Sequence, residues 1–451
     1  MRRLVITPLL LAGCATYTAR PLETADAAAR YHDRRVDAPA VRAALDSLGV
    51  PSSAEGWRDW EFAEAAWVIR PERARLEAQV RAAEAVLVTA GARPDPGLVT
   101  ETEYAFSGSG SESRWGPAVS GVFTVELGGK RGARIGRANA GVLVAVAQAS
   151  NEAWAVRWRV REALTEREVA RHRLASAQQE FALLDSELVV VRARYRDGTV
   201  SRVELARVEA DRQDWQAEVA ARRRDFEGRR AALAAAMGFS ASQVDSIPLV
   251  RSDTSFCDLA VATDSLDALA LRSRRELLEV LGEYQVAEAE VRLAVAETWP
   301  DIALGPGLFY DRGVGKWTIG FSLPSIALNR HKGPIGEAEA RREVAARRVA
   351  EVQEMILSSV EVAEAGCVAA REERDSLKVS GVRTQLELLD SAYARGEIGQ
   401  LDLVLARLDV ARAAGHLVDA EDRLWLAGLD LEHALGVWSG APASRPEKRD
   451  L

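Results

Sequence analysis

Two carboxylates stand at matching places in this sequence and could act on ions. Glu204 follows Gly198 by six residues, and Asp402 follows Gly396 by six. If copies of the chain surrounded a common axis, each position would become a ring of carboxylates, which favours cations and narrows a pore. The alternative is that each acid lies in the first turn of a helix, where the helix dipole stabilises a negative charge.

Residues suited to metal binding or acid–base catalysis are sparse. The five histidines are scattered and only three methionines occur, so no ligand cluster of useful spacing is visible. Neither a Gly-x-Ser-x-Gly elbow nor a His-Glu-x-x-His helix is found. We therefore expect no enzymatic activity, no metal site and no cofactor.

The overall composition excludes two further classes of protein. The 451 residues include 67 acidic and 59 basic side chains, which are interspersed, so no basic stripe could neutralise the phosphates of a nucleic acid. The hydrophobic fraction of 48% is too high for a disordered chain. Beyond the N-terminus no segment has about 18 consecutive apolar residues, so any membrane crossing would require a closed β-barrel.

The N-terminus has the parts of an export signal. Arg2 and Arg3 precede an apolar run, and small residues lead into Cys14. The four residues that end at Cys14 look like a bacterial lipoprotein box, which predicts a signal peptide at residues 1–13 and a covalent lipid on Cys14. Acyl chains contribute about 0.8 kcal/mol per buried CH₂ and would hold the protein to a membrane. An ordinary signal peptide that ends near a cysteine is the alternative.

Only two further cysteines occur, Cys257 and Cys367. In an exported protein they could form a disulfide. Their spacing does not decide the matter, and we favour two separate thiols.

Two halves of the chain match at a nearly fixed offset, which indicates an internal repeat. Tyr195 and Gly198 recur as Tyr393 and Gly396, 198 residues later. The apolar spacing before each tyrosine recurs as well. We predict a signal peptide, a lipidated N-terminal segment that wraps the outside of a barrel or acts as a tether, two repeats, and a disordered tail, at residues 1–13, 14–67, 68–250, 251–438 and 439–451.

Each half contains a pair of alternating segments. Trp317, Ile319, Phe321 and Leu323 alternate with small or polar residues, which is typical of a strand with one apolar face. The four predicted strands cover residues 98–106, 118–127, 301–310 and 317–323. Their length suits a tilted bilayer-spanning strand, but four strands cannot close a barrel, so several copies would each donate four.

Long helices follow each strand pair. Residues 136–195 and 336–393 are rich in Ala, Glu, Arg, Leu and Val and contain no proline, so each could run about 85–90 Å at 1.5 Å per residue. Small alanines among larger apolar residues suit coiled-coil packing. We expect helices over about 132–238 and 334–436, projecting away from the membrane, and an α+β fold overall.

The order of these elements resembles the TolC-like outer membrane efflux proteins, over about residues 70–438. Supporting strings are residues 90–94, residues 299–301, and the Tyr-x-x-Gly pattern at both turns. Residues 305–307 and 333–342 look most like the heavy-metal, CzcC/CusC-like lipoprotein branch. The resemblance implies a homotrimer with a shared transmembrane β-barrel and a periplasmic helical barrel, and Ala15 after the lipidated cysteine suggests the outer membrane.

The resemblance also implies a function. Such a chain would be the outer-membrane channel of a tripartite efflux system, passively conducting heavy-metal cations from an inner-membrane pump and a periplasmic adaptor to the exterior. In similar proteins the adaptor docks at the helix turns, and ordinary helix hairpins are the alternative. The corresponding residues here are Tyr195, Asp197, Gly198, Tyr393, Arg395 and Gly396.

Asp402 is the better gate candidate and Glu204 the second, because similar proteins use the acid after the second turn. The further acid that the family often has three residues later is Leu405 here, with Arg207 at the repeat equivalent. A drug or protein-secretion duct of the same family remains an alternative. A non-pore coiled-coil envelope lipoprotein is a third hypothesis, against which the strand pairs argue.

Overall fold

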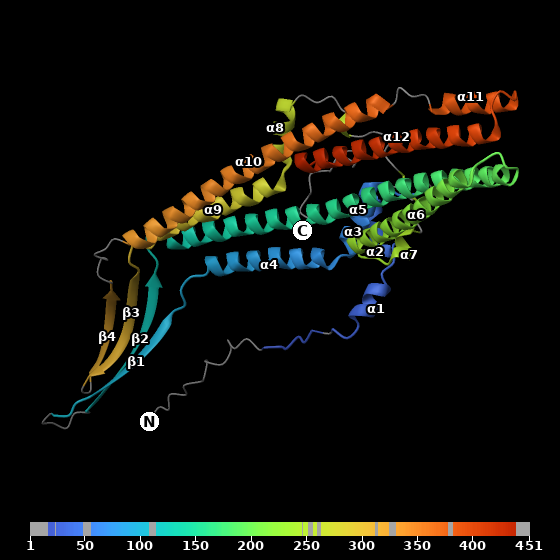
Figure 1. Cartoon of the computed structure of the whole chain (residues 1–451). Helices are drawn as coiled ribbons and strands as arrows, with labels where there is room; N and C mark the ends of the chain where they lie inside the picture. Colours follow the sequence, from blue (N-terminus) through green and yellow to red (C-terminus); the bar gives the residue numbers. More distant parts are fainter. Residues whose placement is uncertain are drawn as a thin grey trace.

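The computed structural model describes residues 17–22, 24–47, 56–107, 114–245, 247–250, 256–258, 263–311, 314–323, 331–377 and 382–438. Helices run along most of the length of the molecule, and a small β-sheet continues them at one end (Figure 1). At the opposite end the helices reverse in two hairpins (Figure 1). The predicted α+β fold class is confirmed as a mostly helical chain with one antiparallel sheet.

Four antiparallel strands form the sheet, in the order β1-β2-β3-β4. They are β1 (Gly97–Tyr104), β2 (Trp115–Val125), β3 (Ile302–Asp311) and β4 (Val314–Ser322). The central pair joins the two halves of the chain, with Phe123 of β2 opposite Leu304 of β3. Each strand overlaps one of the four segments that the alternation predicts.

A layer of helices repeats the order of the strands. The helices connected to the sheet are α4 (Pro71–Gly91), α5 (Lys130–Arg196), α9 (Arg275–Ala296) and α10 (Lys332–Leu377). Helix α4 leads into β1, α5 follows β2, α9 leads into β3 and α10 follows β4. Helix α4 packs on α5, α5 on α9 and α9 on α10. The four helices therefore lie in the same order as the four strands to which they connect.

The part of the layer away from the sheet is built from the two hairpins. Helix α6 (Arg202–Met237) returns along α5, and α12 (Gln400–Leu435) packs between α5 and the pair α10 and α11 (Val382–Ala394). The helix predicted over residues 136–195 is α5. The one predicted over residues 336–393 corresponds to α10 and α11, and residues 378–381 lie outside the described residues.

The N-terminal segment contributes to the central core. Its helices are α1 (Ala27–His32), α2 (Pro39–Ser47) and α3 (Asp59–Ile69). Val41 and Phe62 are fully buried against Val160 of α5 and Met237 of α6, with the short α7 (Ala241–Asp245) beside them. The described part of this segment is therefore more than a tether, because α2 and α3 are packed at mid-length of the molecule (Figure 1).

A second core lies beside the start of the second half, and it contains a disulfide. Cys257 lies in a short 3₁₀ turn (Phe256–Asp258) before α8 (Thr263–Ser273), and Cys367 lies on α10. Their Cα atoms are 5.3 Å apart and the sulfurs are bonded. The prediction of two separate thiols is wrong. The residues are 110 apart in sequence, and only the fold, which brings the turn at Phe256–Asp258 next to α10, makes them neighbours.

Candidate functional site

Glycine closes the first hairpin tip. Helix α5 ends just before Asp197, and Gly198 has a φ of 72°. Its amide donates to the carbonyl of Tyr195 at 3.0 Å, and the amide of Thr199 donates to the carbonyl of Arg194 at 2.9 Å. Residues with a Cβ atom are strained at this φ, so the glycine permits the chain to reverse.

The second tip repeats this geometry. Helix α11 ends at Ala394, and Gly396 has a φ of 75°. The Gly396 amide donates to the carbonyl of Tyr393 at 2.9 Å. Beside it Arg395 forms an ion pair with Glu397 at 2.5 Å, and the hydrogen bond from Arg395 lowers the pKa of the Glu397 carboxyl. The two tips share a backbone conformation and differ in their charged side chains.

The tips are packed against each other through apolar side chains. This cluster consists of Leu188, Val190, Val191, Val208 and Leu401, with Val200 and Leu205 partly buried against it. Tyr195 and Tyr393, in contrast, are exposed. Their accessibility is compatible with adaptor docking, and the docking role of the six tip residues stays a prediction.

Both candidate gate acids lie in the first turn of a helix. A carboxylate oxygen of Asp402 accepts a hydrogen bond from the amide of Gly399, the N-cap residue of α12, at 3.1 Å. In the first tip the Ser201 hydroxyl caps α6 by accepting from the amide of Glu204 at 3.2 Å, and Glu204 itself is exposed. Asp402 therefore has a capping contact of its own, and the gate role of both acids stays a prediction.

Buried carboxyls follow the α5 face that meets α12. Glu180 and Glu187 are both buried. Burial raises the pKa of the Glu187 carboxyl, and nearby Asp211 raises it further, whereas Arg412 lowers it. Burial likewise raises the pKa of Glu180, against the opposing effect of Arg412. A carboxyl whose pKa is raised by burial favours the folded state less as pH rises through that pKa.

The sheet has one apolar face and one polar face. Trp317, Ile319 and Phe321 are 67%, 64% and 78% exposed, although they are large and hydrophobic. The register places Leu308 opposite Trp317 and Leu304 opposite Phe321, so the apolar face continues across the strands. It also includes Leu98, Tyr104, Trp115, Val119, Phe123, Val125, Ile302 and Tyr310.

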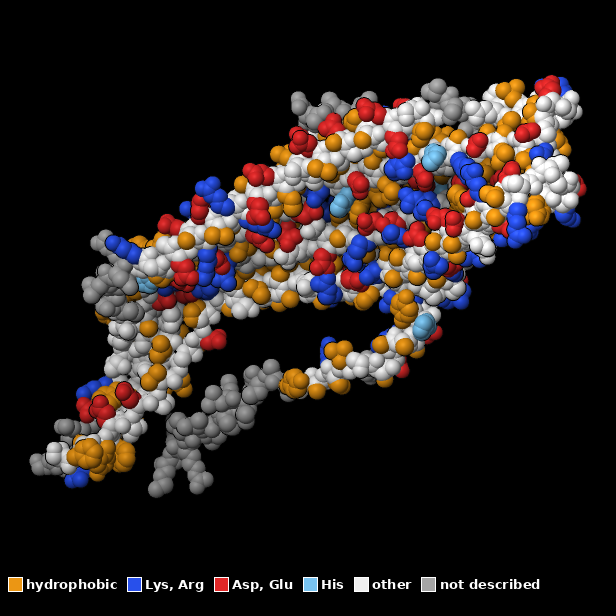
Figure 2. All heavy atoms as spheres, viewed as in Figure 1, with side chains coloured by type: hydrophobic (Ala, Val, Ile, Leu, Met, Phe, Trp, Pro, Cys, Tyr) orange, Lys and Arg blue, Asp and Glu red, His pale blue; other side chains and the backbone are white. Residues whose placement is uncertain are grey.

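Aromatic side chains lie near both ends of this apolar face. Tyr104 and Trp115 are in contact at the end away from the helices, with ring centroids 4.8 Å apart, and Phe123 and Phe321 lie toward the helices. Charged side chains cover the helices densely but are few over the middle of the sheet (Figure 2). Aromatic bands at two levels with an apolar band between them are typical of strands that face lipid.

The opposite face of the sheet carries mainly small and polar residues, together with Val99, Val122 and Phe309. Gly307 could not carry a side chain, because an added Cβ atom would lie 2.9 Å from that of Ser120. Toward the outer end, away from the helices, Lys316 forms an ion pair with Asp311 at 2.7 Å. Glu101 lies in the same cross-strand row as Lys316. This face is suited to water.

Helices and metal ligands give two further findings. In the described part of the chain, no helix is long and apolar enough to cross a membrane. Among the same residues, no three His, Cys, Asp or Glu side chains are grouped to hold a metal ion. Cys14 and the predicted signal peptide lie outside the described residues, as does the predicted tail at 439–451, so the lipid anchor stays a prediction.

Two arginines at the junctions between helices were not predicted from the sequence. Arg70 and Arg274 each precede a helix and are each followed two residues later by a glutamate, Glu72 and Glu276. Each arginine donates to its glutamate and to carbonyls at the C-terminal end of another helix. The Arg-x-Glu string, repeated at an offset of 204, is the signal that could have identified them.

Comparisons with known proteins identify the fold. No protein-family model and no curated protein matches the chain. Among solved structures, the outer membrane protein VceC from Vibrio cholerae is similar with a TM-score of 0.64 and 19% identity, over 83% of this chain and 95% of that one. CusC, described for its transmembrane channel formation, gives 0.64 and 15%, over 87% and 96%. The open MtrE outer membrane channel of Neisseria gonorrhoeae gives 0.58 and 17%, over 84% and 89%. The chain thus has the fold of outer-membrane channels.

Proposed function

We propose that this chain is an outer-membrane efflux duct of the TolC-like family, which passively conducts cargo from an inner-membrane pump and a periplasmic adaptor to the exterior. The two-faced sheet carries the proposal. Soluble monomers rarely leave a continuous apolar face such as that around Trp317 and Phe321 uncovered. Lipid on one side of the sheet and water on the other explains both faces. The shared fold with solved outer-membrane channels supports it.

A homotrimer would complete the duct. Strands β1 and β4 are the edges of the sheet, and every residue of both is exposed. Within the described part of the chain, each has one side without a neighbouring strand. Exposed edges are normally paired or blocked. Three copies would join their sheets edge to edge in one transmembrane β-barrel, and the helices that continue the strands would then form a periplasmic helical barrel. The matching tips support a twofold repeat within each copy.

The tips would carry docking and gating. A periplasmic adaptor would dock at the exposed ends around Tyr195 and Tyr393. In a trimer Asp402 would form one ring of carboxylates and Glu204 another, which would constrict the entrance and favour cations. Because Asp402 also caps its helix, its removal would both discharge the ring and loosen the first turn of α12.

Heavy-metal cations are the cargo that we propose. Carboxylates on the polar face of the sheet, among them Glu101 and Glu103, favour cations over anions. A lipid on Cys14, exposed after removal of residues 1–13, would anchor the N-terminus to the outer membrane. The chain would act as a conduit and not as an enzyme, and the choice of cargo would rest with the pump.

Conductance of the full-length, detergent-solubilised protein in planar bilayers tests the proposal. We expect discrete channels from the native chain, and channels that open more readily or lose cation preference after Asp402→Ala. Asp409→Ala is the matched control, because Asp409 is an exposed acid on the same helix. If a well-folded oligomer gives no channels under any condition, the proposal is wrong and a structural coiled-coil lipoprotein is the better account.

A further inference from the structure

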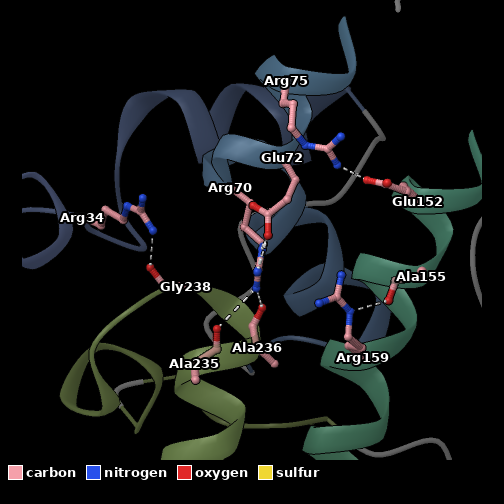
Figure 3. A network of polar contacts seen from close by, with 10 residues as sticks. All are labelled: Arg34, Arg70, Glu72, Arg75, Glu152, Ala155, Arg159, Ala235, Ala236 and Gly238. Carbon is pink, nitrogen blue, oxygen red and sulfur yellow. Dashed lines mark hydrogen bonds and ion pairs between the residues drawn. The ribbon is translucent and has the colours of Figure 1, made fainter. Parts of the chain in front are cut away.

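An arginine joins the end of α6 to the start of α4. Arg70 is the N-cap residue of α4, and its Nη1 donates to the carbonyls of Ala235 and Ala236 in the last turn of α6. Its Nε donates to the Glu72 carboxylate at 3.0 Å, and its Nη2 does so at 2.5 Å. Figure 3 shows the guanidinium between the two helix ends. One side chain thus binds a carboxylate of one helix and two carbonyls of another.

A second arginine joins the end of α12 to the start of α9 in the same way. Arg274 is the N-cap residue of α9, and its Nη1 donates to the carbonyls of His433 at 3.1 Å and Ala434 at 3.2 Å. Its Nε and Nη2 donate to Glu276 at 3.0 and 3.1 Å. Each contact of Arg70 therefore has a counterpart here.

In each half a further arginine donates to the carbonyl of the glycine that directly follows α6 or α12. Gly238 and Gly436 have φ values of 75° and 67°. The Gly238 carbonyl accepts from Arg34 at 3.0 Å, and the Gly436 carbonyl accepts from Arg275 at 3.5 Å. The sources differ, because Arg34 belongs to the N-terminal segment whereas Arg275 belongs to α9 itself.

Tyr31 strengthens the first junction alone. Its hydroxyl donates to the carbonyl of Phe239, directly after α6, at 3.1 Å. With Arg34, it ties the N-terminal segment to the end of α6 (Figure 3 shows the Arg34 contact). Both contacts are directed at backbone carbonyls and are separate from the apolar packing of α2 and α3.

Physical chemistry explains why arginine is used. The last carbonyls of a helix have no partner within it and carry partial negative charge. Water has poor access at the second junction, because Ala434 and Leu435 are buried and the Arg274 contact with Ala434 is buried too. At the first junction Met237 is fully buried, but the Arg70 contact with Ala235 is exposed. A planar guanidinium with five donors can serve carbonyls and a carboxylate together, which a lysine ammonium cannot do with the same geometry. Helix α6 runs end to end with α4, and α12 with α9 (Figure 1).

We propose that Arg70 and Arg274 are equivalent positioning residues, which splice α6 to α4 and α12 to α9 into two columns running from tip to sheet. The N-terminal segment completes the first splice through Arg34 and Tyr31. The link to conduction rests on the proposed function, because a continuous column would hold each tip in register with the sheet. The splice itself does not depend on that function.

Hydrogen exchange of the full-length protein in detergent tests the splice. In Arg70→Lys the charge remains and the fork is lost, so we expect amides in the last turn of α6 and the first turn of α4 to exchange about tenfold faster. Arg274→Lys should do the same at α12 and α9 only, and Arg34→Gln at the end of α6 only. Arg75→Gln is the control, because Arg75 forms an exposed ion pair with Glu152 beside the first junction (Figure 3) and should change neither end.

Two results would overturn the proposal: unchanged exchange at the junctions in the lysine variants, or a uniform rise along the whole chain. Should Arg70→Lys fail to fold, Arg34→Gln still tests the first junction, since Arg34 lies outside the core. Exchange is read without any channel activity. A protein that shows the predicted pattern but no conductance would keep the splice and refute the duct, and the reverse pattern would do the opposite.

Discussion

The two halves of the chain have the same order of elements but are held by different anchors in the middle of the molecule. We call this anchored region the base of each half. In each half one helix rises to the sheet and the next descends from it. At the base of the first half, Arg161 of α5 is ion-paired with Asp59 of α3 at 2.8 Å and with Glu432 of α12. At the base of the second, a disulfide between Cys257 and Cys367 ties the turn at Phe256–Asp258 to α10. Charge fixes one base and a covalent bond fixes the other.

This difference separates what the two similar halves share from what differs between them. The strands, the helices and the turn glycines follow from local patterns, which recur in both halves. The anchors only have to hold two segments together, and several kinds of contact do that. Arg161 is also stacked against Trp158 and Trp438 and is almost fully buried. Buried ion pairs give specificity more than net stability, whereas a disulfide restricts the unfolded chain.

Removing the disulfide should have the largest effect on this comparison. The Cys257→Ser and Cys367→Ser double variant reopens a loop of 110 residues, which should cost about 5 kcal/mol in the free energy of unfolding. Hydrogen exchange should therefore rise in α8, α9 and α10 and stay unchanged in α3 and α5. Equal loss of protection in both halves would show that the bases are not independent anchors.

A chemical control uses the native protein. Cys257 and Cys367 are 1% and 3% exposed, so a reductant without denaturant should leave the exchange pattern unchanged. Rapid reduction under native conditions would mean that the second base opens readily, contrary to its burial.

The disulfide also marks the limit of sequence-based prediction here. Alternation around Trp317 and the glycines at the tips depend on residues close in sequence, so the strands and turns could be predicted. The cysteine pairing and the contact of Arg34 with Gly238, 204 residues away, depend on where the fold brings distant segments. The contact of Asp402 with the Gly399 amide is of the local kind, since it spans three residues and agrees with the alternative that this acid lies in the first turn of a helix.

Substitution of the tip glycines should have an intermediate effect, equal in both halves. Nothing lies within 4 Å of a Cβ atom added to Gly198 or Gly396, so only their positive φ opposes a side chain. Gly198→Ala and Gly396→Ala should each destabilise their tip by about 1–2 kcal/mol. Local hydrogen exchange of the adjacent turns measures this. Gly141→Ala, within α5 and equally unobstructed, should be neutral or stabilising. A large difference between the tips would break their equivalence.

The smallest effect concerns a position where the halves differ in burial. Glu187 is buried on α5, which has α6 on one side and α12 on the other, whereas its counterpart 198 residues later, Gln385, is exposed on α11. At this position the first half thus keeps a carboxyl in a buried environment, which disfavours its charged form. Burial and the neighbouring Asp211 raise the pKa of the Glu187 carboxyl, with Arg412 and Arg207 opposing them.

Glu187→Gln should therefore stabilise the first hairpin, and the gain should depend on pH. The folded state binds the Glu187 proton more tightly than the unfolded chain, so native stability is greatest below the unfolded pKa and falls as pH rises through the folded pKa. At neutral pH the variant should be more stable by about 0.5–1 kcal/mol, and the difference should vanish near pH 4. Thermal unfolding in detergent across this range measures it, with the exposed Glu152→Gln as the control. A pH-independent gain would mean that Glu187 acts through packing, and that burial of charge is not what distinguishes the two halves at this position.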